Sequence, residues 1–315
     1  MIDAAIQPCT VCGTPNNSRY LFEKISDGRG EGSIRVYHCG ECKSVFLGKY
    51  SEIFDDQLYA YYTKYVGKTK NQVYDPLTKS SYFQVLKLLN SYGGGKTILD
   101  VGCGNGAFVD AAMAQGYDIK GIELSQSAVD IANRFNLPVK RIDFFSTEIE
   151  SSSFDILTMF EVIEHLPEPV LFLQRAEHVV KRGGLIYITT PNYNSLDRRI
   201  LDKNWSVFQR EHLTYFTPTT LIKAVERNTG FEVLYIETRN VSEQLIGRLM
   251  QLLLSYLPLK RPIFSDDVNA RAPQSDTRAI ISGSPWLSLI KRGINFFLNA
   301  TGLGSTIVIV LKRPQ

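Results

Sequence analysis

The sequence predicts an α/β fold in which a mostly parallel sheet carries helices on both faces. Two observations lead to this prediction: short apolar runs of β-forming residues recur through the middle of the chain, and helix-forming segments separate them. The run 97–99 is followed by Asp100 and then by Gly102, Gly104 and Gly106, before a new helical segment begins. Glycines at such a strand-to-helix turn let the backbone approach a ligand closely, so the unit is Rossmann-like.

The spacing of these glycines separates two kinds of cofactor. A dinucleotide site has the pattern Gly-x-Gly-x-x-Gly, whereas here the third glycine comes one residue earlier. A second predicted strand ends at Glu123, about 20 residues further on, where a carboxylate accepts hydrogen bonds from ribose hydroxyls. S-adenosylmethionine has an adenosine, a sulfonium and an ammonium group but no phosphate, so Asp100 and Glu123 match it better than they match NAD.

Three later segments complete a resemblance to the class I S-adenosylmethionine-dependent methyltransferases. They are a third strand at 139–144, a fourth strand running into Glu-Val-Ile-Glu-His-Leu at 161–166, and a fifth strand entered through Gly183 and Gly184. The resemblance implies a doubly wound, seven-stranded sheet whose last strand is antiparallel. It also implies a cofactor site made of Asp100, Gly102, Cys103, Gly104, Asn105, Gly106, Glu123, Leu124, Asp143, Phe144 and Phe160.

Four of the five cysteines form two C-x-x-C pairs, Cys9 with Cys12 and Cys39 with Cys42. In a chain whose start lacks a signal peptide, this spacing favours a tetrahedral structural zinc over disulfides, with a redox-active pair as the alternative. The stretch between the pairs exceeds the common spacing of about 15 to 20 residues, and the excess predicts a hairpin of strands 19–25 and 33–38. His38 is interpreted as a bystander.

This cysteine module resembles the zinc ribbon that precedes the methyltransferase domain in enzymes acting on sugars, polysaccharide precursors and natural products. The two resemblances predict the organisation of the chain. Residues 1–50 form the ribbon, and residues 51–95 form a helical linker or cover that includes the tyrosine-rich stretch 58–65. The methyltransferase domain consists of 96–240 and 304–315, and an amphipathic helical insertion at 241–303 precedes the last strand.

Bulk composition disfavours one class of partner. The chain has 315 residues, 44% of them hydrophobic and 21% charged, and a net charge of +3, so no nucleic-acid partner is expected. The N-terminal residues have neither the basic start nor the apolar run of a signal peptide, which predicts a cytoplasmic protein, or one peripheral at the inner face of the membrane.

The segments after the fifth strand predict the acceptor side of the site. Residues 192–214 lack clear periodicity and are interpreted as a loop over the strand ends, where open α/β sheets bind ligands. In the insertion, two helical faces are apolar, one at 245–257 and one at 286–298, the latter including Trp286, Ile294, Phe297 and Leu298. They predict either a lid buried on the domain or a patch that associates weakly with a membrane surface.

Methyl transfer to a hydroxyl needs a group that removes the hydroxyl proton. We expect His165 to be this base, His212 to be its partner or alternate, and Glu161 to lie nearer the methionine end of the cofactor. Alternatively, Glu161, Glu164, His165 and His212 hold a divalent metal at the acceptor site, as a similar segment does in some relatives, or Glu164 and His165 merely cap and orient the loop.

The sequence thus predicts a methyltransferase that uses S-adenosylmethionine and a structural zinc and acts on a hydroxyl of a sugar or glycan precursor. The alternatives are a sugar C-methyltransferase, a quinone or lipid O-methyltransferase, and a cofactor-binding module without catalysis. The expected partner is a small-molecule, glycan or lipid-linked acceptor.

Overall fold

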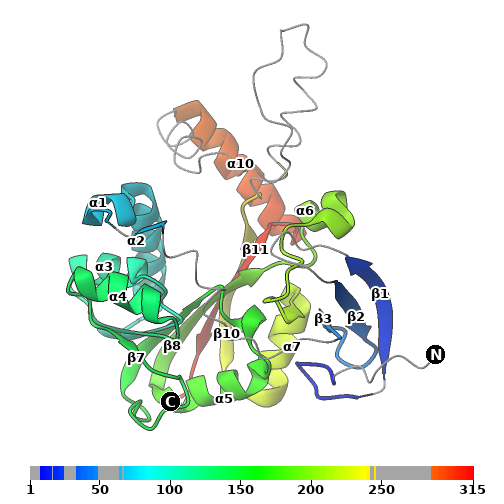
Figure 1. Ribbon diagram of the computed structural model, residues 1–315, viewed down its shortest axis with the longest axis horizontal. Helices are drawn as coiled ribbons and strands as arrows, with labels where there is room; N and C mark the ends of the chain where they lie inside the picture. The colour runs from blue at the N-terminus through cyan, green and yellow to red at the C-terminus, as the bar shows by residue number, and fades with distance from the viewer. Residues whose placement is uncertain are drawn as a thin grey trace, which may run out of the picture.

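The computed structural model describes residues 8–15, 17–24, 33–48, 64–65, 67–241, 245 and 285–315. Its centre is a seven-stranded sheet with helices on both faces (Figure 1). In spatial order the strands are β10 (Glu232–Arg239), β11 (Thr306–Lys312), β8 (Val180–Pro191), β7 (Phe154–Phe160), β4 (Thr97–Val101), β5 (Asp118–Glu123) and β6 (Val139–Arg141). The pairs among β8, β7, β4, β5 and β6 are parallel, and β11 runs antiparallel to both of its neighbours, β10 and β8. The predicted fold class is confirmed.

Alternation along the strands divides the core into two layers. Ile98 packs with α2 (Pro76–Ser91), α3 (Ala107–Ala114) and α4 (Gln126–Arg134), whereas its neighbour Leu99 faces α5 (Pro169–Val179) and α7 (Pro218–Asn228). Consecutive residues of a strand point to opposite faces, so a sheet covered on both sides needs continuous apolar runs such as these.

The helix before β4 lies within the predicted helical linker 51–95 and begins at Pro76. Asp75 caps α2, because its carboxylate accepts hydrogen bonds from the backbone N–H groups of Leu77 and Thr78. Pro76 then occupies the first helical turn, where a missing N–H costs nothing. A short helix, α1 (Lys70–Val73), precedes it. Of the tyrosine-rich stretch, residues 58–63 lie outside the described residues.

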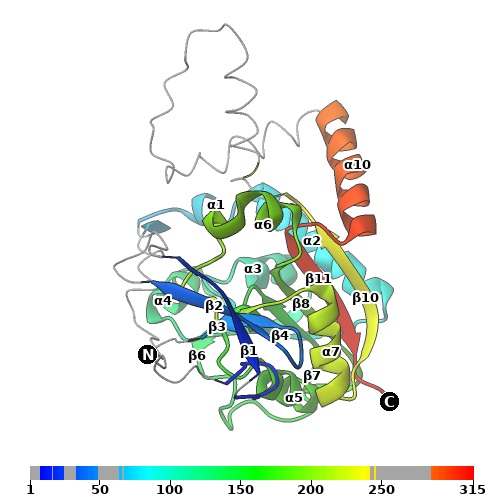
Figure 2. The same cartoon turned by 90° about the vertical axis from the view of Figure 1, so that its right-hand side faces the viewer.

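The N-terminal module is a second, four-stranded sheet of order β1-β2-β3-β9. Its strands are β1 (Ser18–Lys24), β2 (Ile34–Cys39), β3 (Val45–Leu47) and β9 (Thr214–Tyr215). Figure 2 shows strands β1, β2 and β3 beside the central sheet. The predicted hairpin is confirmed as β1 and β2, which pair antiparallel. Sequence patterns did not predict that β9, which follows the central parallel strands in the sequence, completes this sheet.

The segment 192–214 is more ordered than the predicted loop. It contains α6 (Leu196–Leu201), a 3-10 turn at Asp202–Asn204 and the start of β9. Trp205 and Phe208 are each 1% exposed and pack on the N-terminal sheet. The interpretation as a loop was wrong for residues 196–204, where a helix and a 3-10 turn form because the segment is anchored by aromatic side chains that pack on residues far away in the sequence.

Only the second helix of the predicted insertion is described, as α10 (Pro285–Thr301); of residues 242–284, Leu245 alone is. α10 projects beyond the edge of the sheet (Figure 1) and is joined to β10 by bonds such as that from the Thr238 hydroxyl to the carbonyl of Leu298. Leu298 is buried, but Ile294 and Phe297 are 46% and 59% exposed, so the described part of the predicted apolar face is not all packed on the domain. Among the described residues, no helix combines the length and the apolar character needed to cross a bilayer.

Candidate active site at the strand ends

The glycine-rich turn after β4 has the backbone that its sequence requires. Gly102, Gly104 and Gly106 all have positive φ, at 66°, 54° and 81°. A side chain at Gly102 would also place its Cβ 2.6 Å from Val162, so only glycine fits there. Gly106 ends the turn as the left-handed cap of α3. The turn exposes backbone groups at the carboxyl end of the strands, where α/β sheets bind their ligands.

Asp100 is the buried acid of this turn. It is 1% exposed, and its Oδ1 accepts a 2.6 Å hydrogen bond from the hydroxyl of Thr158 on the neighbouring strand β7. Burial raises the pKa of Asp100 to about 7, and the nearby carboxylate of Glu123 acts in the same direction. A buried carboxyl group with a raised pKa is suited to a cationic ligand, because a positive charge beside it restores the ionised form.

Glu123 joins the end of β5 to the glycine turn. One carboxylate oxygen accepts a 2.9 Å hydrogen bond from the N–H of Gly104, and the other accepts bonds from the N–H groups of Leu124 and Ser125 at 2.8 and 2.9 Å. A carboxylate offers about four acceptor positions. The Glu123 side chain therefore holds the turn in place with three hydrogen bonds. These bonds leave about one acceptor position of its carboxylate for the predicted contact with ribose.

The remaining predicted cofactor residues fall into two groups. Cys103, Asn105 and Leu124 lie in or beside the turn, and the carbonyl of Asn105 accepts a 2.7 Å bond from the hydroxyl of Tyr74. Tyr74 was missed by sequence reasoning because nothing in its local pattern shows that it will reach the turn. It holds the turn from the side of α1 and α2.

The second group lies beyond the turn. Phe144 is 3% exposed and stacks on Phe172, with ring centroids 5.3 Å apart, so it is a core residue. Asp143 lies after β6, which ends at Arg141 rather than at the predicted residue 144, and its Oδ1 accepts from the N–H of Phe145. In the described part of the chain, no hydrogen bond or ring contact links Asp143 or Phe144 to the glycine turn.

Phe160, at the end of β7, also contacts other aromatic side chains. Its ring centroid lies 4.8 Å from that of Phe108 and 5.4 Å from that of Tyr82. Phe160 is half-buried and packs against the apolar cluster that includes α2 and α3. Its predicted contact with the cofactor stays a prediction.

Of the residues predicted for the acceptor side, Glu164, His165 and His212 lie together. His165 also bonds to the carbonyl of Glu211, which is 46 residues away in the sequence. Their ligand atoms all lie within 4.8 Å of one another. The rings of His165 and His212 meet edge to face with centroids 4.6 Å apart. Nδ1 of His165 bonds to the carbonyl of Glu211 and Nδ1 of His212 to that of Val207, both at 2.8 Å. In a neutral imidazole, Nδ1–H donation to a carbonyl leaves Nε2 as the basic nitrogen.

Glu164 is the buried member of this cluster. It is 1% exposed, its Oε2 accepts from the hydroxyl of Thr190, and its Oε1 is buried without a hydrogen-bond partner, 3.8 Å from Nε2 of His165. Burial raises the pKa of Glu164 well above its ordinary value, and the charge of Glu161 raises it further. An oxygen in this state is suited to share a proton or bind a cation.

Glu161 stands at the turn between β7 and this cluster in a strained conformation. Its φ is 54°, which is uncommon for a residue with a side chain, and its N–H is held by the carbonyl of Thr189 at 3.0 Å. The residue has an exposed surface, yet the protein atoms around its carboxylate desolvate it and raise its pKa to about 7. Arg239 opposes this rise.

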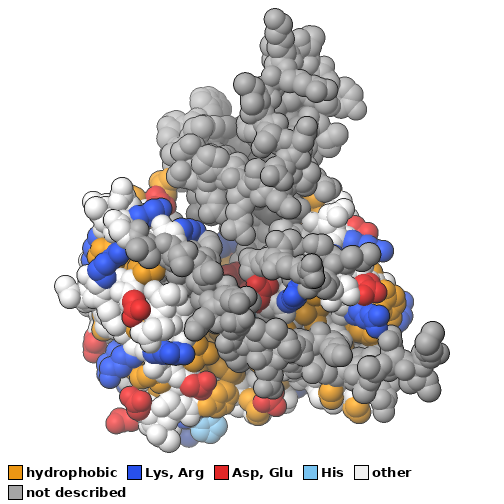
Figure 3. Space-filling view, in the orientation of Figure 1, with side chains coloured by type: hydrophobic (Ala, Val, Ile, Leu, Met, Phe, Trp, Pro, Cys, Tyr) orange, Lys and Arg blue, Asp and Glu red, His pale blue; other side chains and the backbone are white. Residues whose placement is uncertain are grey.

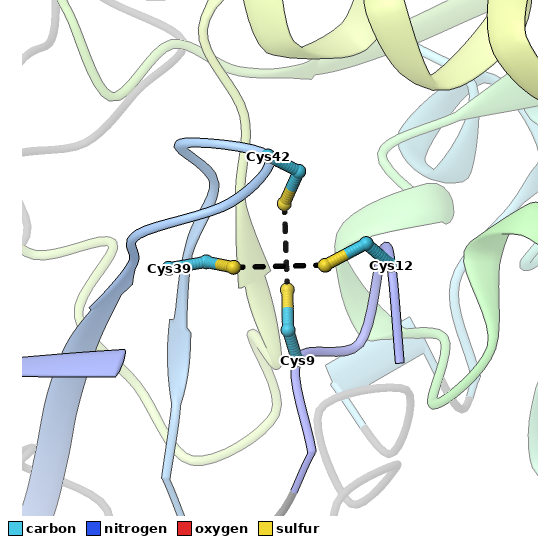
Figure 4. Close-up of side chains that lie close together, drawn as sticks. All are labelled: Cys9, Cys12, Cys39 and Cys42. Atoms are coloured by element: carbon cyan, nitrogen blue, oxygen red, sulfur yellow. Dashed lines mark hydrogen bonds between the residues drawn. The ribbon is translucent and has the colours of Figure 1, made fainter. Parts of the chain in front are cut away.

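The four paired cysteines meet at one point of the N-terminal sheet, with their sulfurs directed to a common centre (Figure 4). The Sγ atoms of Cys9 and Cys42 are 3.6 Å apart, as are those of Cys12 and Cys39, so all four are free thiols. Four sulfurs at about 2.3 Å from a tetrahedral zinc would stand about 3.8 Å from each other. The hydrogen bond from the Cys9 thiol lowers the pKa of Cys42 to about 4, which favours a thiolate there.

The order of the strands, the glycine turn after β4 and the acid at the end of β5 define a class I S-adenosylmethionine-dependent methyltransferase domain. Residues 82–236 match the family model described as "Methyltransferase domain". This match covers the five parallel strands, α3 to α7 and both halves of the candidate site.

Curated relatives share this part of the chain. An enzyme named ubiquinone biosynthesis O-methyltransferase from Paraburkholderia phymatum is 34% identical over 107 residues, which are 32% of this chain and 46% of that protein. One of the same name from Idiomarina loihiensis is 31% identical over 133 residues, 39% of this chain and 52% of that protein. The chain thus spans about half the length of the curated relatives it matches.

A solved structure of a SAM-dependent methyltransferase from Archaeoglobus fulgidus is similar to this chain with a TM-score of 0.49 and 19% identity. The superposition covers 81% of this chain and 99% of that one.

Proposed function

We propose that this protein transfers the methyl group of S-adenosylmethionine to a hydroxyl oxygen. The observation that supports it is the cluster of Glu164, His165 and His212 at the same edge of the sheet as the glycine turn. Methyl transfer from a sulfonium is an in-line displacement. The enzyme therefore has to hold the methyl carbon of the donor and the acceptor oxygen about 3 Å apart, in line, and exclude water. An acceptor-side base next to a donor site is the arrangement that this reaction needs.

Each half of the site has a role in this mechanism. Glu123 accepts from the ribose and Asp100 faces the cationic end of the cofactor. His165 takes the acceptor proton at Nε2, because its Nδ1–H is held by the carbonyl of Glu211. His212, edge to face with His165, is its partner or alternate, and Glu161 lies between these groups and the strand end.

A divalent metal is the second candidate for activating the acceptor. The residues fit one: Glu164 contributes a buried oxygen without a hydrogen-bond partner, and the two histidines direct their Nδ1 atoms to carbonyls, as histidine ligands do when Nε2 binds the metal. Mg²⁺, Mn²⁺ or Zn²⁺ bound there would lower the pKa of an acceptor hydroxyl. Without the metal, the same three side chains bind and orient the acceptor and receive its proton.

Two acceptor classes have support. The cysteine ribbon resembles that of enzymes acting on sugars and glycan precursors, which favours a sugar hydroxyl, with C-methylation of a sugar as the variant. The curated relatives are named for ubiquinone biosynthesis, which favours a phenolic hydroxyl on a quinone precursor or another lipid. A phenol, with a pKa on the order of 10, needs a weaker base than a sugar hydroxyl.

The other parts of the proposal concern the ribbon, the surface and the location. One zinc ion would bind the thiolates of Cys9, Cys12, Cys39 and Cys42 and hold the ribbon together. The exposed Ile294, Phe296 and Phe297 of α10 favour weak, peripheral association with a membrane from the cytoplasmic side. On the face seen in Figure 3, basic and acidic side chains are interspersed over the described residues. The proposed partner is a small-molecule, glycan or lipid-linked acceptor.

The experiment incubates the protein and labelled S-adenosylmethionine with a sugar-nucleotide panel and with catechols, with and without Mg²⁺, and identifies the products by mass spectrometry. His165→Asn and His212→Asn should lower turnover by about 10²-fold or more and leave the affinity for S-adenosylhomocysteine unchanged. His178→Asn is the matched control, because this histidine lies on α5 and bonds to its own helix. Binding of S-adenosylhomocysteine without turnover of any acceptor, cell extract included, would favour the cofactor-binding module without catalysis.

A further inference from the structure

The cysteine ribbon and the acceptor side of the site share one β-sheet. β3 of the ribbon pairs with β9 in the register Val45 to Tyr215 and Phe46 to Thr214. β9 begins two residues after His212. A strand that is missing from the ribbon's own sequence is thus supplied by the segment that carries an acceptor-side histidine.

Leu213 ties the two parts together through both of its backbone groups. Its N–H donates a 2.8 Å hydrogen bond to the carbonyl of Glu164, and its carbonyl accepts a 3.0 Å bond from the N–H of Leu47 in β3. The residue next to His212 is therefore held between the ribbon and the segment that carries Glu164 and His165. Displacing β3 would break one of these two bonds.

A side-chain bond adds to this connection beside the cysteines. The hydroxyls of Thr10 and Thr214 are hydrogen-bonded at 2.6 Å, and Thr214 is fully buried. Thr10 lies between Cys9 and Cys12, in the turn that a metal would order. A change in the conformation of that turn would thus act on Thr214 through a single hydrogen bond.

The carbonyl that orients the His212 ring also depends on the ribbon. Nδ1 of His212 bonds to Val207, which lies in the segment anchored by Trp205 and Phe208. These two rings are buried against the ribbon, and Phe22 of β1 meets Phe208 edge to face at 4.8 Å. Both the backbone and the ring of His212 are therefore fixed by contacts with the N-terminal module.

The cofactor side is linked to the ribbon by apolar packing and not by hydrogen bonds: Cys39 and Phe46 belong to the same apolar cluster as Val101 and Ile122, which come just before the glycine turn and Glu123. Among the described residues, no hydrogen bond joins the ribbon to the glycine turn or to Glu123, whose partners are Gly104, Leu124 and Ser125. Tyr74 and α2 support that side instead. Loss of a hydrogen bond in the ribbon should therefore alter the acceptor side of the site and leave cofactor binding unchanged.

We propose that the four-cysteine ribbon, when it binds zinc, is the positioning element for His212, so that metal loading controls the acceptor side while cofactor binding is independent of it. Thr10, Thr214 and Leu47 transmit the position. The inference rests on the proposed role of His212 in methyl transfer. The four thiols fit zinc by the distances between their sulfurs.

The test measures hydrogen exchange of the peptide 208–216 in the full chain by mass spectrometry. Thr10→Val removes the hydroxyl bond to Thr214 and should make exchange of this peptide about fivefold faster, the factor expected for one lost neutral hydrogen bond, with zinc still bound. Thr10→Ser should restore the wild-type rate. Removing zinc with a chelator should give a larger effect in the same peptide.

Two controls locate the effect. Ser33→Ala changes a hydroxyl at the far end of the β1–β2 hairpin, where Ser33 bonds to Glu23, and should leave exchange of 208–216 unchanged. The affinity for S-adenosylhomocysteine should stay within twofold of wild type in every variant, which shows that the methyltransferase domain is folded.

Equal exchange of 208–216 in Thr10→Val and wild type would overturn the proposal, as would absence of zinc from the purified protein. A parallel fall in S-adenosylhomocysteine affinity would also overturn it, because the ribbon would then support the whole domain. Failure of wild type to methylate any acceptor would defeat the proposed function instead, and the exchange result would still report whether the ribbon positions the segment.

Discussion

Replacing Asp100 with asparagine should make the protein more stable and bind its cofactor less well. Asp100 is fully buried, and burial raises its pKa from 3.8 to about 7. Asparagine has nearly the same shape, and its Oδ1 can accept the bond from the Thr158 hydroxyl that Asp100 accepts. The substitution therefore removes the ionisable group without removing that hydrogen bond or leaving a cavity.

The pKa values of Asp100 in the folded and unfolded states set how the stability of the protein changes with pH. Between about pH 4 and pH 7, Asp100 is ionised in the unfolded chain and protonated in the folded one, so folding takes up a proton and the free energy of unfolding falls as pH rises. A pKa difference of about 3 units corresponds to about 4 kcal/mol at pH 8, where the folded protein holds a buried charge. Asp100→Asn should recover much of this at pH 8 and none of it at pH 4.

When the cofactor is bound, the negative charge of Asp100 becomes favourable instead of costly. An ammonium group bound beside Asp100 favours the ionised carboxylate, and a charged hydrogen bond contributes about 1.5 to 3 kcal/mol. We expect Asp100→Asn to bind S-adenosylhomocysteine at least about tenfold less tightly at pH 8, with a smaller difference at pH 6. Because the amine of the ligand titrates equally with both proteins, the difference between them reports Asp100.

The assay is urea unfolding and calorimetric titration of S-adenosylhomocysteine at pH 5, 6, 7 and 8. Asp110→Asn is the control of opposite sign: burial acts to raise the pKa of Asp110, but Lys70 and Lys79 hold it below its ordinary value. That variant should lose stability above about pH 4. Equal effects of Asp100→Asn on stability at pH 5 and pH 8, or an unchanged affinity for the ligand, would refute the reasoning.

Three further predictions follow from the same geometry. Glu123→Gln should weaken S-adenosylhomocysteine binding by about tenfold or more through lost charged hydrogen bonds, and a change below about fivefold in calorimetry would contradict the ribose assignment. Metal analysis of protein made under reducing conditions should find one zinc per chain, in Cys103→Ser as in wild type, whereas finding none would exclude the ribbon site. Co-sedimentation with anionic vesicles should be weak and sensitive to salt, and lower in Phe296→Ser with Phe297→Ser; if neither protein sediments, α10 does not bind membranes.

The central sheet was predictable because its signals are local. The run 97–99, the acid at 100 and the glycines at 102, 104 and 106 specify a strand, a turn and a helix by short-range sterics alone. Strand ends were predicted to within a few residues, the error being largest at β6, where three residues of extended composition continue past the last pairing. The roles of individual site residues remain predictions, although the structure places Asp100, the glycines and Glu123 in one cluster.

The meeting of His165 and His212 was not determined by any local pattern. His165 follows β7 and His212 follows an irregular segment, and their contact depends on β9 pairing with a ribbon strand from the start of the chain. A strand of two residues is too short to show an alternating apolar pattern. Burial of Trp205 and Phe208 against the ribbon determines which strand β9 pairs with. The sequence by itself therefore determined the sheet and the cofactor turn. Tertiary packing alone decided that His212 lies beside Glu164 and His165, because long-range burial, and not local propensity, fixes where an irregular segment lies.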